Sequence, residues 1–274
     1  MRNGKKIGDI VSYLVLALAV VIALFPLLYL LSMSFKPRGL ITTKPTLWLF
    51  KPSLEHYHKV IVEGFFLKYL FNSIIVATSS TIITLIVSLP AAFSIARFRV
   101  GGENISFWIL SIKMLPPMVF LVPIYVIFQH LRLLDRLVGL IIVYVAFNSP
   151  LAVWLLRSFI EELPKEVEEQ AMVDGCTRLS AFSRVVIPLL IPGILVTIAL
   201  TFISSWNEFL MALILTLEKA RTITVAASEY ITGYGILWGD IAAAGVIAII
   251  PNIILAVTLQ RYLVRGLTLG IIKG

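Results

Sequence analysis

The sequence is poor in charge and in cysteine. Of its 274 residues, 14% are charged and 59% are apolar, whereas a soluble globular domain carries about 25% charged and about 45–50% apolar residues. A single folded core in water cannot hide that much apolar surface, so an ordinary cytosolic enzyme, a disordered tail and a disulfide-stapled secreted domain are excluded. Cys176 is the only cysteine, which leaves no intrachain disulfide and no multi-cysteine metal site. The composition is that of a polytopic membrane protein.

The usual signatures of cofactor chemistry are also missing from the sequence. No segment carries the Gly-x4-Gly-Lys-Ser/Thr pattern whose backbone wraps nucleotide phosphates, and residues 266–274 lack its Gly-Lys-Ser/Thr ending. His56, His58 and His130 fit no metal spacing, and we expect ordinary loop residues there. We therefore predict that the chain is not an enzyme and binds no cofactor or metal. Its net charge of +8 indicates contact with anionic membrane lipid rather than nucleic acid.

Six stretches are long and apolar enough to cross a bilayer, which takes about 20 residues. They predict an all-α integral membrane protein with a single transmembrane domain over residues 1–274. The first stretch is about twice as long as a signal-peptide core, so we expect an anchor. The six predicted spans cover residues 10–33, 70–95, 105–128, 137–156, 189–213 and 241–263.

An even number of spans places both termini on the same side of the membrane. With the termini inside, twelve Lys and Arg residues fall in inner segments and ten in outer ones. That bias is too small to fix the orientation by the positive-inside rule.

Proline interrupts several spans, including the pair Pro116–Pro117. These prolines either kink packed helices, which membrane helices tolerate, or loosen a bundle that rocks between two arrangements.

The segment between the fourth and fifth spans, residues 157–188, breaks the hydrophobic pattern and holds six of the chain's fifteen acids. Acids favour the positive N-terminal end of a helix. Val167 and Ala171 share one face of that helix. Gly175 is a good C-terminal stop, and Thr177 is a good cap for a second short helix. The segment predicts a helix–glycine–helix elbow on the membrane surface.

This elbow resembles the "EAA" loop of ABC importer permeases, whose pattern is Glu-Ala-Ala, three residues, Gly, nine residues, Ile-x-Leu-Pro. The sequence departs from it at Gln170, Val185 and Ile187. In that family the loop docks into a cleft on the ATP-binding subunit and carries the motion of ATP-driven closure to the spans. The resemblance implies a coupling loop that faces the cytoplasm, and therefore cytoplasmic termini. The residues that it assigns to coupling are Glu169, Gln170, Ala171, Asp174, Gly175, Val185, Ile187 and Pro188.

Two further segments are similar to the smaller permease of maltose-type carbohydrate importers. They are Ser205-Trp206-Asn207-Glu208-Phe209-Leu210 and the tail from Gln260 to Thr268. The resemblance implies the type I ABC importer permease fold in the cytoplasmic (inner) membrane. It implies four kinds of partner. Three are proteins: a second, homologous permease that completes a heterodimer, two ATP-binding cassette subunits that use ATP and Mg, and an extracytoplasmic sugar-binding protein. The fourth is membrane lipid. The solute is then a di- or oligosaccharide.

Lys113 and Glu208 lie within predicted spans, where an ionised group costs at least a few kcal/mol unless it is paired or wet. Trp, Asn and carboxylate groups suit the rings and hydroxyls of sugars, so Trp206, Asn207, Glu208 and Lys113 are candidates for the translocation path. Alternatively, Glu208 pairs with a Lys or Arg, in this chain or in the partner permease, and holds the bundle together.

The resemblance also assigns roles to one outer loop and to the tail. Tyr230, Tyr234 and Trp238 are candidates to reach the sugar-binding protein, or they anchor the chain at the membrane interface. Arg265 and Lys273 are candidates to contact the ATPase subunits, or they lie near anionic headgroups.

Two alternative functions stay open. The same machinery could carry a non-sugar such as glycerol phosphate, which would favour a basic path, although Lys113 is the only Lys or Arg deep within a span. An ion-coupled secondary transporter could work through Lys113 and Glu208. That class usually shows an internal repeat, and the sequence contains no convincing one.

Overall fold

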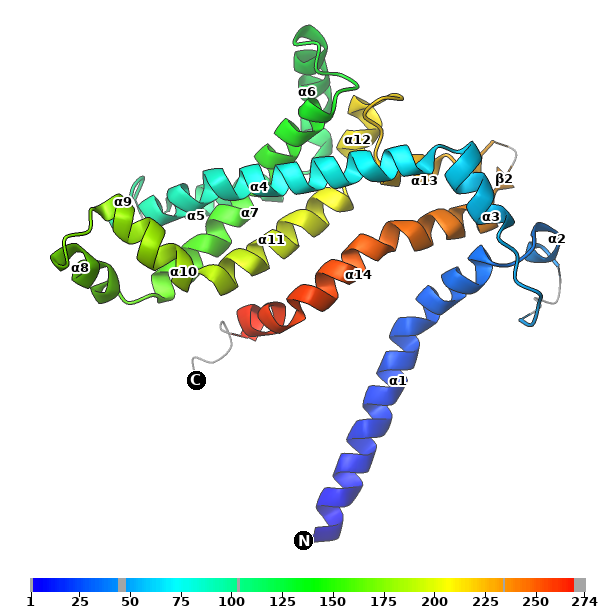
Figure 1. Cartoon of the computed structure of the whole chain (residues 1–274), viewed down its shortest axis with the longest axis horizontal. Helices are drawn as coiled ribbons and strands as arrows, with labels where there is room; N and C mark the ends of the chain where they lie inside the picture. The colour runs from blue at the N-terminus through cyan, green and yellow to red at the C-terminus, as the bar shows by residue number, and fades with distance from the viewer. Residues whose placement is uncertain (1, 44–47, 103, 234, 269–274) are drawn as a thin grey trace. The chain divides into compact units, whose positions relative to one another are not determined.

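A computed structural model describes residues 2–43, 48–102, 104–233 and 235–268 of the chain (Figure 1). Its contacts divide it into two compact units. The first comprises Met1–Leu67 with Ala226–Ile250, and the second comprises Lys68–Val225 with Pro251–Gly274. The single transmembrane domain stays a prediction.

Helices account for nearly all regular structure, and the only strands among the described residues form a short hairpin. In chain order the elements are α1 (Arg2–Ser34), α2 (Arg38–Ile41), α3 (Glu55–His58), the π-helical turn η1 (Lys59–Glu63), α4 (Phe66–Phe98), α5 (Ile105–Met114), α6 (Met118–His130), α7 (Leu137–Glu162), α8 (Glu166–Val173), α9 (Arg178–Ala181), the π-helical turn η2 (Phe182–Val186), α10 (Ile187–Leu189), α11 (Ile191–Trp206), α12 (Leu210–Leu215), α13 (Ile223–Ser228), β1 (Ile231–Thr232), β2 (Gly235–Ile236) and α14 (Trp238–Thr268).

Four described helices are long and apolar enough to cross a membrane by themselves. They include Val11–Ser34, Phe66–Phe98, Leu137–Glu162 and Trp238–Arg261. Two bent helix pairs raise the number to six if each pair counts as one span. The predicted all-α membrane architecture is therefore present, while the count of six spans and the side of the termini stay predictions.

The predicted third span, residues 105–128, is not one continuous helix. α5 ends at Met114, α6 begins at Met118, and the two helices meet at an angle of 89°. Leu115 is extended, with φ −71° and ψ 136°, as expected of a residue that precedes a proline. Pro116 and Pro117 have no N–H with which to continue the helical ladder. The two adjacent prolines therefore stop the helix rather than kink it, and the assignment of residues 105–128 to one span stays a prediction.

The predicted fifth span, residues 189–213, is broken as well. α11 ends at Trp206, and α12 begins at Leu210. At its other end α11 turns by 74° from the segment Arg178–Leu189. Thr197 and six other residues of α11 are buried. The apolar run therefore contains one straight helix of 16 residues and a short helix beyond it.

α7 lies at the centre of the second unit. Its first half contributes Tyr144 to an apolar cluster with side chains of α4, α6 and α12, and its second half contributes Leu156 to another cluster with α4 and η2. α11 packs along α7 (Figure 1). Gly193 permits this close approach, because a Cβ atom there would lie 2.5 Å from Cγ of Phe159.

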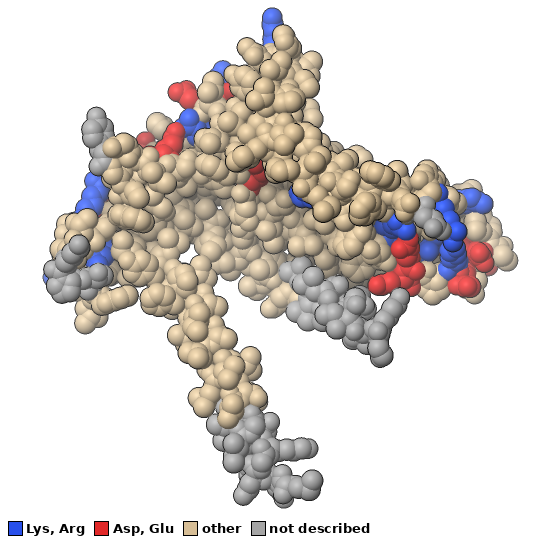
Figure 2. Space-filling model, turned by 180° about the vertical axis from the view of Figure 1, so that it is seen from behind, with Lys and Arg blue, Asp and Glu red and all other residues tan. Residues whose placement is uncertain are grey.

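The helices keep much apolar surface that no described residue covers. In α1, Tyr13 is 73% exposed and Phe25 is 55% exposed, and a soluble monomer rarely leaves so large an apolar patch open. In Figure 2 charged side chains gather at the end of the second unit that carries α8 and α9, while the flanks of its helices are almost entirely uncharged. This is the surface of an integral membrane protein.

Candidate functional site

The elbow between α7 and α11 begins with α8, a two-turn helix. Glu166, Glu168 and Glu169 occupy its first turn, where negative charge is stabilised by the helix dipole. Val167 and Ala171 are half-buried, whereas Glu169 and Gln170 are exposed. Val167 and Ala171 therefore share the inward face of α8, as the spacing predicts, while Glu169 and Gln170 face outward.

Gly175 ends α8 as predicted from the sequence. Its φ is +91°, a conformation that glycine adopts without steric cost. The N–H of Cys176 donates to the carbonyl of Ala171 at 3.0 Å, and the N–H of Gly175 donates to the carbonyl of Met172 at 3.1 Å. These two bonds are those of a Schellman motif, which satisfies the last carbonyls of a helix. The turn is thus defined by its own hydrogen bonds.

Thr177 starts the second arm of the elbow. Its hydroxyl accepts a hydrogen bond from the N–H of Ser180 at 3.3 Å, which confirms the predicted cap of α9. The arm continues without a break through η2 into α10, where Pro188 lies. The expected second helix is therefore present, with a π-helical turn in its middle.

The elbow is tied to the end of α4 by two contacts that sequence analysis missed. Nε of Arg97 donates to Oε1 of Glu168 at 2.6 Å, and Nη2 of Arg97 donates to the carbonyl of Leu163 at 3.0 Å. Both side chains of the ion pair are largely buried, at 5% and 14% exposure. The guanidinium of Arg178 lies 5.3 Å from the ring centre of Phe98. No local signal in the sequence indicates that Arg97 faces α8.

The tip of the elbow exposes apolar side chains that sequence analysis did not single out. Val173 is 87% exposed, Leu179 is 76% exposed and Met172 is 37% exposed. Met172 and Val173 lie in the last turn of α8, and Leu179 lies in α9 on the other side of Gly175. Exposed apolar side chains grouped around a rigid turn are typical of a surface that packs against another protein.

The residues assigned to coupling all lie on this elbow. Ala171, Val185 and Ile187 are half-buried, and Glu169, Gln170, Asp174, Gly175 and Pro188 are exposed. The structure brings them together on one continuous segment, with the exposed members in contact with solvent.

A second polar site surrounds Glu208, in the break between α11 and α12. Its carboxylate accepts the N–H of Met211 at 2.8 Å and of Ala212 at 3.0 Å, and it accepts the hydroxyl of Tyr144 at 2.9 Å. The first two bonds satisfy the N–H groups that open α12. Glu208 therefore caps a helix within this chain and forms no ion pair with any described residue.

Lys113 lies at the end of α5 and faces the same site. Its ammonium donates to the carbonyl of Phe147 at 3.1 Å rather than to the Glu208 carboxylate. Both residues line a small cavity of about 80 Å3, together with Tyr144 and Asn148. Three helices thus bring polar groups to one cavity.

The other two candidates for the path differ in exposure. Trp206 is 2% exposed and its ring stacks on Phe202 at 5.7 Å. Asn207 is exposed, and its Oδ1 accepts a hydrogen bond from Asn252 at 3.3 Å. Asn207 is therefore open to a ligand or another chain, whereas Trp206 lies within the bundle.

The candidate outer loop contains the hairpin β1–β2. The strands pair antiparallel, with Ile231 opposite Ile236. Tyr230 precedes the hairpin and is half-buried, and Trp238 follows it and is 53% exposed. Tyr234 and Lys273 lie outside the described residues, and the side chain of Arg265 lies outside them too.

His56 is not the ordinary loop residue that we expected. It lies in α3 with 2% exposure, and Nδ1 lies 2.5 Å from Oδ1 of Asp240 while Nε2 lies 3.0 Å from the carbonyl of Lys36. Lys59 donates to the other Asp240 oxygen at 2.7 Å. Both ring nitrogens of His56 thus face oxygen atoms, one of Asp240 and one of the Lys36 backbone. The expectation was wrong because Asp240 is 184 residues away in the chain.

Asp135 joins two loops of the second unit. Its carboxylate accepts backbone N–H groups of Leu217, Lys219 and Ala220, each at 3.0 Å. Burial by itself raises the pKa of the Asp135 carboxyl, but these donors outweigh burial and hold that pKa below its ordinary value. The ionised carboxylate therefore fastens the turn after α12 to the turn before α7.

Comparison with known proteins adds a family to this geometry. Residues 84–269 match the profile of the family described as "Binding-protein-dependent transport system inner membrane component". The match contains the elbow, the break at Glu208 and the second half of α4. Among the described residues, no group of three or more His, Cys, Asp or Glu side chains is placed to hold a metal ion.

Curated relatives align along nearly the whole chain. The diacetylchitobiose uptake system permease protein DasC of Streptomyces coelicolor is 36% identical over 91% of this chain and 92% of its own length. The trehalose/maltose transport system permease protein MalG of Thermococcus litoralis is 34% identical over 98% of both chains. These relatives are permease proteins and not enzymes.

A solved structure has the same fold. One chain of a bacterial ABC transporter involved in the import of the acidic polysaccharide alginate superposes with a TM-score of 0.77. The alignment covers 94% of this chain and 97% of that chain, at 24% sequence identity. At this identity the likeness establishes the fold alone.

Proposed function

This chain belongs to the family of binding-protein-dependent transport system inner membrane components and is a permease subunit of an ABC importer, and we propose that it forms, with a second and different permease, the path of a di- or oligosaccharide. Two ATP-binding cassette subunits use ATP and Mg to drive the transport, and an extracytoplasmic protein delivers the sugar. The elbow and both termini then face the cytoplasm, and the chain lies in the inner membrane with six spans.

The observation that carries this proposal is the construction of the elbow. Hydrogen bonds at Gly175 fix the angle between its arms, and apolar side chains such as Val173 and Leu179 stand exposed at its tip. A surface that is rigid and apolar, and that projects from a membrane domain, suits docking into a cleft of another protein. In our proposal that cleft belongs to the ATPase subunit.

Two routes would carry motion from the elbow to the spans. The ion pair between Arg97 and Glu168 links α8 to the end of α4. η2 and α10 lead directly into α11, which turns by 74° at Leu190. A displacement of the elbow would therefore act on α4 and α11 together, because packed helices move as bodies rather than deform.

For the translocation path, the geometry favours Asn207 over its neighbours. Asn207 is exposed beside the break in α11, so its amide is open to sugar hydroxyls. Glu208 and Trp206 make their contacts within the bundle, and we propose that they hold Asn207 in place. Lys113, which lines the cavity with Glu208, borders the path.

The solute class rests on the relatives. Two of them are named for trehalose/maltose and for diacetylchitobiose, which are small saccharides. For the remaining assigned residues we propose that Tyr230, Tyr234 and Trp238 reach toward the sugar-binding protein, and that Arg265 and Lys273 contact the ATPase subunits.

The test is sugar uptake into membrane vesicles that contain this chain and the products of its neighbouring genes. We expect uptake that requires ATP and the binding protein, with no uptake when this chain is omitted. Uptake by the purified chain alone, driven by an ion gradient, would contradict the proposal.

A protease-sensitive tag after Gly274 tests the orientation, and we expect protection of that tag in intact cells.

A further inference from the structure

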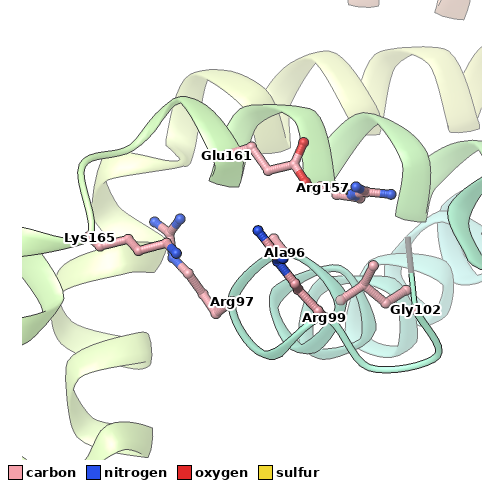
Figure 3. A pocket seen from close by; sticks show the side chains of 8 residues that line it. Ala96, Arg97, Arg99, Gly102, Arg157, Glu161 and Lys165 are labelled. Atoms are coloured by element: carbon pink, nitrogen blue, oxygen red, sulfur yellow. Dashed lines mark hydrogen bonds and ion pairs between the residues drawn. The ribbon is translucent and has the colours of Figure 1, made fainter. Parts of the chain in front are cut away.

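A hollow of about 320 Å3 lies beside the elbow in the second unit, where α4 and α7 end. Figure 3 shows basic side chains that approach it from α4, from the turn that follows α4, from α7 and from the loop that follows α7. The residues that line it are Ile95, Ala96, Arg97, Arg99, Gly102, Arg157, Glu161 and Lys165.

The hollow has more positive charge than its own residues neutralise. Arg157 pairs with Glu161 at 2.7 Å, and Arg97 pairs with Glu168 at 2.6 Å. The side chains of Arg99 and Lys165 make no hydrogen bond or ion pair with any residue that the structure describes. Besides the two ion pairs, Arg99 and Lys165 therefore line the hollow without a counter-ion among the described residues.

The position of Arg99 is fixed by the backbone. Its N–H donates to the carbonyl of Ile95 at 3.1 Å, and its φ is +51°. A residue other than glycine rarely adopts this backbone conformation. Lys165 is held at the other side of the hollow, because its carbonyl accepts the N–H groups of Glu168 and Glu169 at the start of α8.

Several apolar side chains close to Arg99 in the sequence are exposed. Phe98 and Val100, which flank Arg99, are 49% and 54% exposed, and Phe107 and Trp108 in the first turn of α5 are 64% and 65% exposed. Trp side chains near the ends of spans are typical of the level of lipid headgroups. The turn that carries Arg99 is thus flanked in the sequence by exposed apolar side chains, which suit acyl chains.

We propose that this hollow binds the phosphate of an anionic phospholipid headgroup, with Arg99 and Lys165 as its principal ligands. Arg and Lys bind phosphate oxygens through charge-assisted hydrogen bonds, and basic pockets between membrane helices are suited to phospholipid headgroups. The exposed apolar side chains favour a lipid over free phosphate, which has no chains to cover them. Because Lys165 opens α8, the bound headgroup holds the base of the elbow.

The proposal requires only that the chain lies in a membrane. It does not depend on the solute, on ATP or on the side that the elbow faces. Failure of the transport assay above and failure of lipid binding are therefore separate results.

The experiment is native mass spectrometry of the full chain, with any subunits that co-purify, after exchange into phosphatidylglycerol or phosphatidylcholine. The test variants are Arg99→Gln and Lys165→Gln, whose side chains are exposed and unpaired within the described residues, so the fold has no need of them. The matched control is Arg184→Gln, which removes an exposed cation of η2 that lies outside the hollow. Arg99→Lys tests whether charge at this position is sufficient.

We expect the wild type to retain phosphatidylglycerol in preference to phosphatidylcholine. Each test variant should weaken retention about fivefold, since a cation that faces the bound headgroup contributes about 1 kcal/mol. Arg184→Gln should match the wild type, because Arg184 does not line the hollow. Arg99→Lys should recover most of the retention. Equal retention of the two lipids, or equal losses in control and test variants, would overturn the proposal. Complete displacement of the lipid by millimolar inorganic phosphate would overturn it in favour of a free-phosphate site. Loss of a co-purified ATPase subunit with unchanged lipid retention would overturn it in favour of a protein contact.

Discussion

Gly175 is the one residue of the elbow with a positive φ. Its φ of +91° lies in the left-handed region, and no atom lies within 4 Å of the place that a Cβ would occupy. A substitution there meets no steric contact with neighbours, so its cost comes from the backbone alone. Residues with different tolerance for positive φ therefore form a graded series at one site.

The magnitude follows from the Schellman motif. Alanine in the left-handed region costs about 1–2 kcal/mol, which lowers the ratio of formed to unformed turn by a factor of about 5–30. Asparagine tolerates positive φ and should cost less. Proline cannot adopt a φ of +91° and has no N–H to donate to Met172. It should therefore abolish both hydrogen bonds, each worth about 0.5–1.5 kcal/mol.

The assay is ATP-driven uptake in vesicles, with membrane insertion of the chain measured in parallel. We expect uptake in the order wild type, Gly175→Asn, Gly175→Ala and Gly175→Pro, with no transport in the last. Gly39→Ala is the control, because Gly39 also has open space around its Cβ position but no positive φ. Full uptake by Gly175→Pro at normal membrane levels, or a larger loss in Asn than in Pro, would refute the coupling role of the turn.

Three further predictions concern contacts far apart in sequence. Arg97→Gln removes a largely buried charged hydrogen bond to Glu168, worth about 1.5–3 kcal/mol, and should reduce co-purification of the ATPase subunits. Normal co-purification would contradict this. Tyr144→Phe removes the hydroxyl donor to Glu208. It should lower the free energy of unfolding by a similar amount, and with it the Tm, without changing membrane insertion; an unchanged Tm would contradict this. Asp135 has a depressed pKa, so its stabilising effect is complete above about pH 4 and is lost as the pH falls further. Asp135→Asn should therefore lower Tm at neutral pH, with the difference from the wild type shrinking below pH 4; a constant difference would be the contrary result.

Local features of the elbow could be predicted from the sequence. Gly175 as the end of α8 and Thr177 as the cap of α9 are both confirmed. Each is set by hydrogen bonds within five residues along the chain, so residue type and spacing contain the information. The same holds for the apolar helices, whose length follows from composition.

Contacts between distant segments could not be predicted. The partner of Arg97 is 71 residues away, and that of His56 is 184 residues away. Helical periodicity indicates which side chains share a face, but not which helix that face meets. Glu208 illustrates the limit, because the sequence did not indicate that its carboxylate accepts the N–H groups that open α12.

The break between α5 and α6 has a consequence for what surrounds it. In an unbroken helix the carbonyl of Lys113 would accept a hydrogen bond from the N–H of residue 117, which is a proline here. The carbonyl of Ile112 accepts the N–H of Leu115 at 3.3 Å instead of an N–H of residue 116. Hydrocarbon offers no substitute donor, and the residues from Ile112 to Val119 are exposed in this chain. The break between α5 and α6 is therefore unsuited to contact with lipid tails. We expect it to contact water, or the backbone and side chains of a companion subunit.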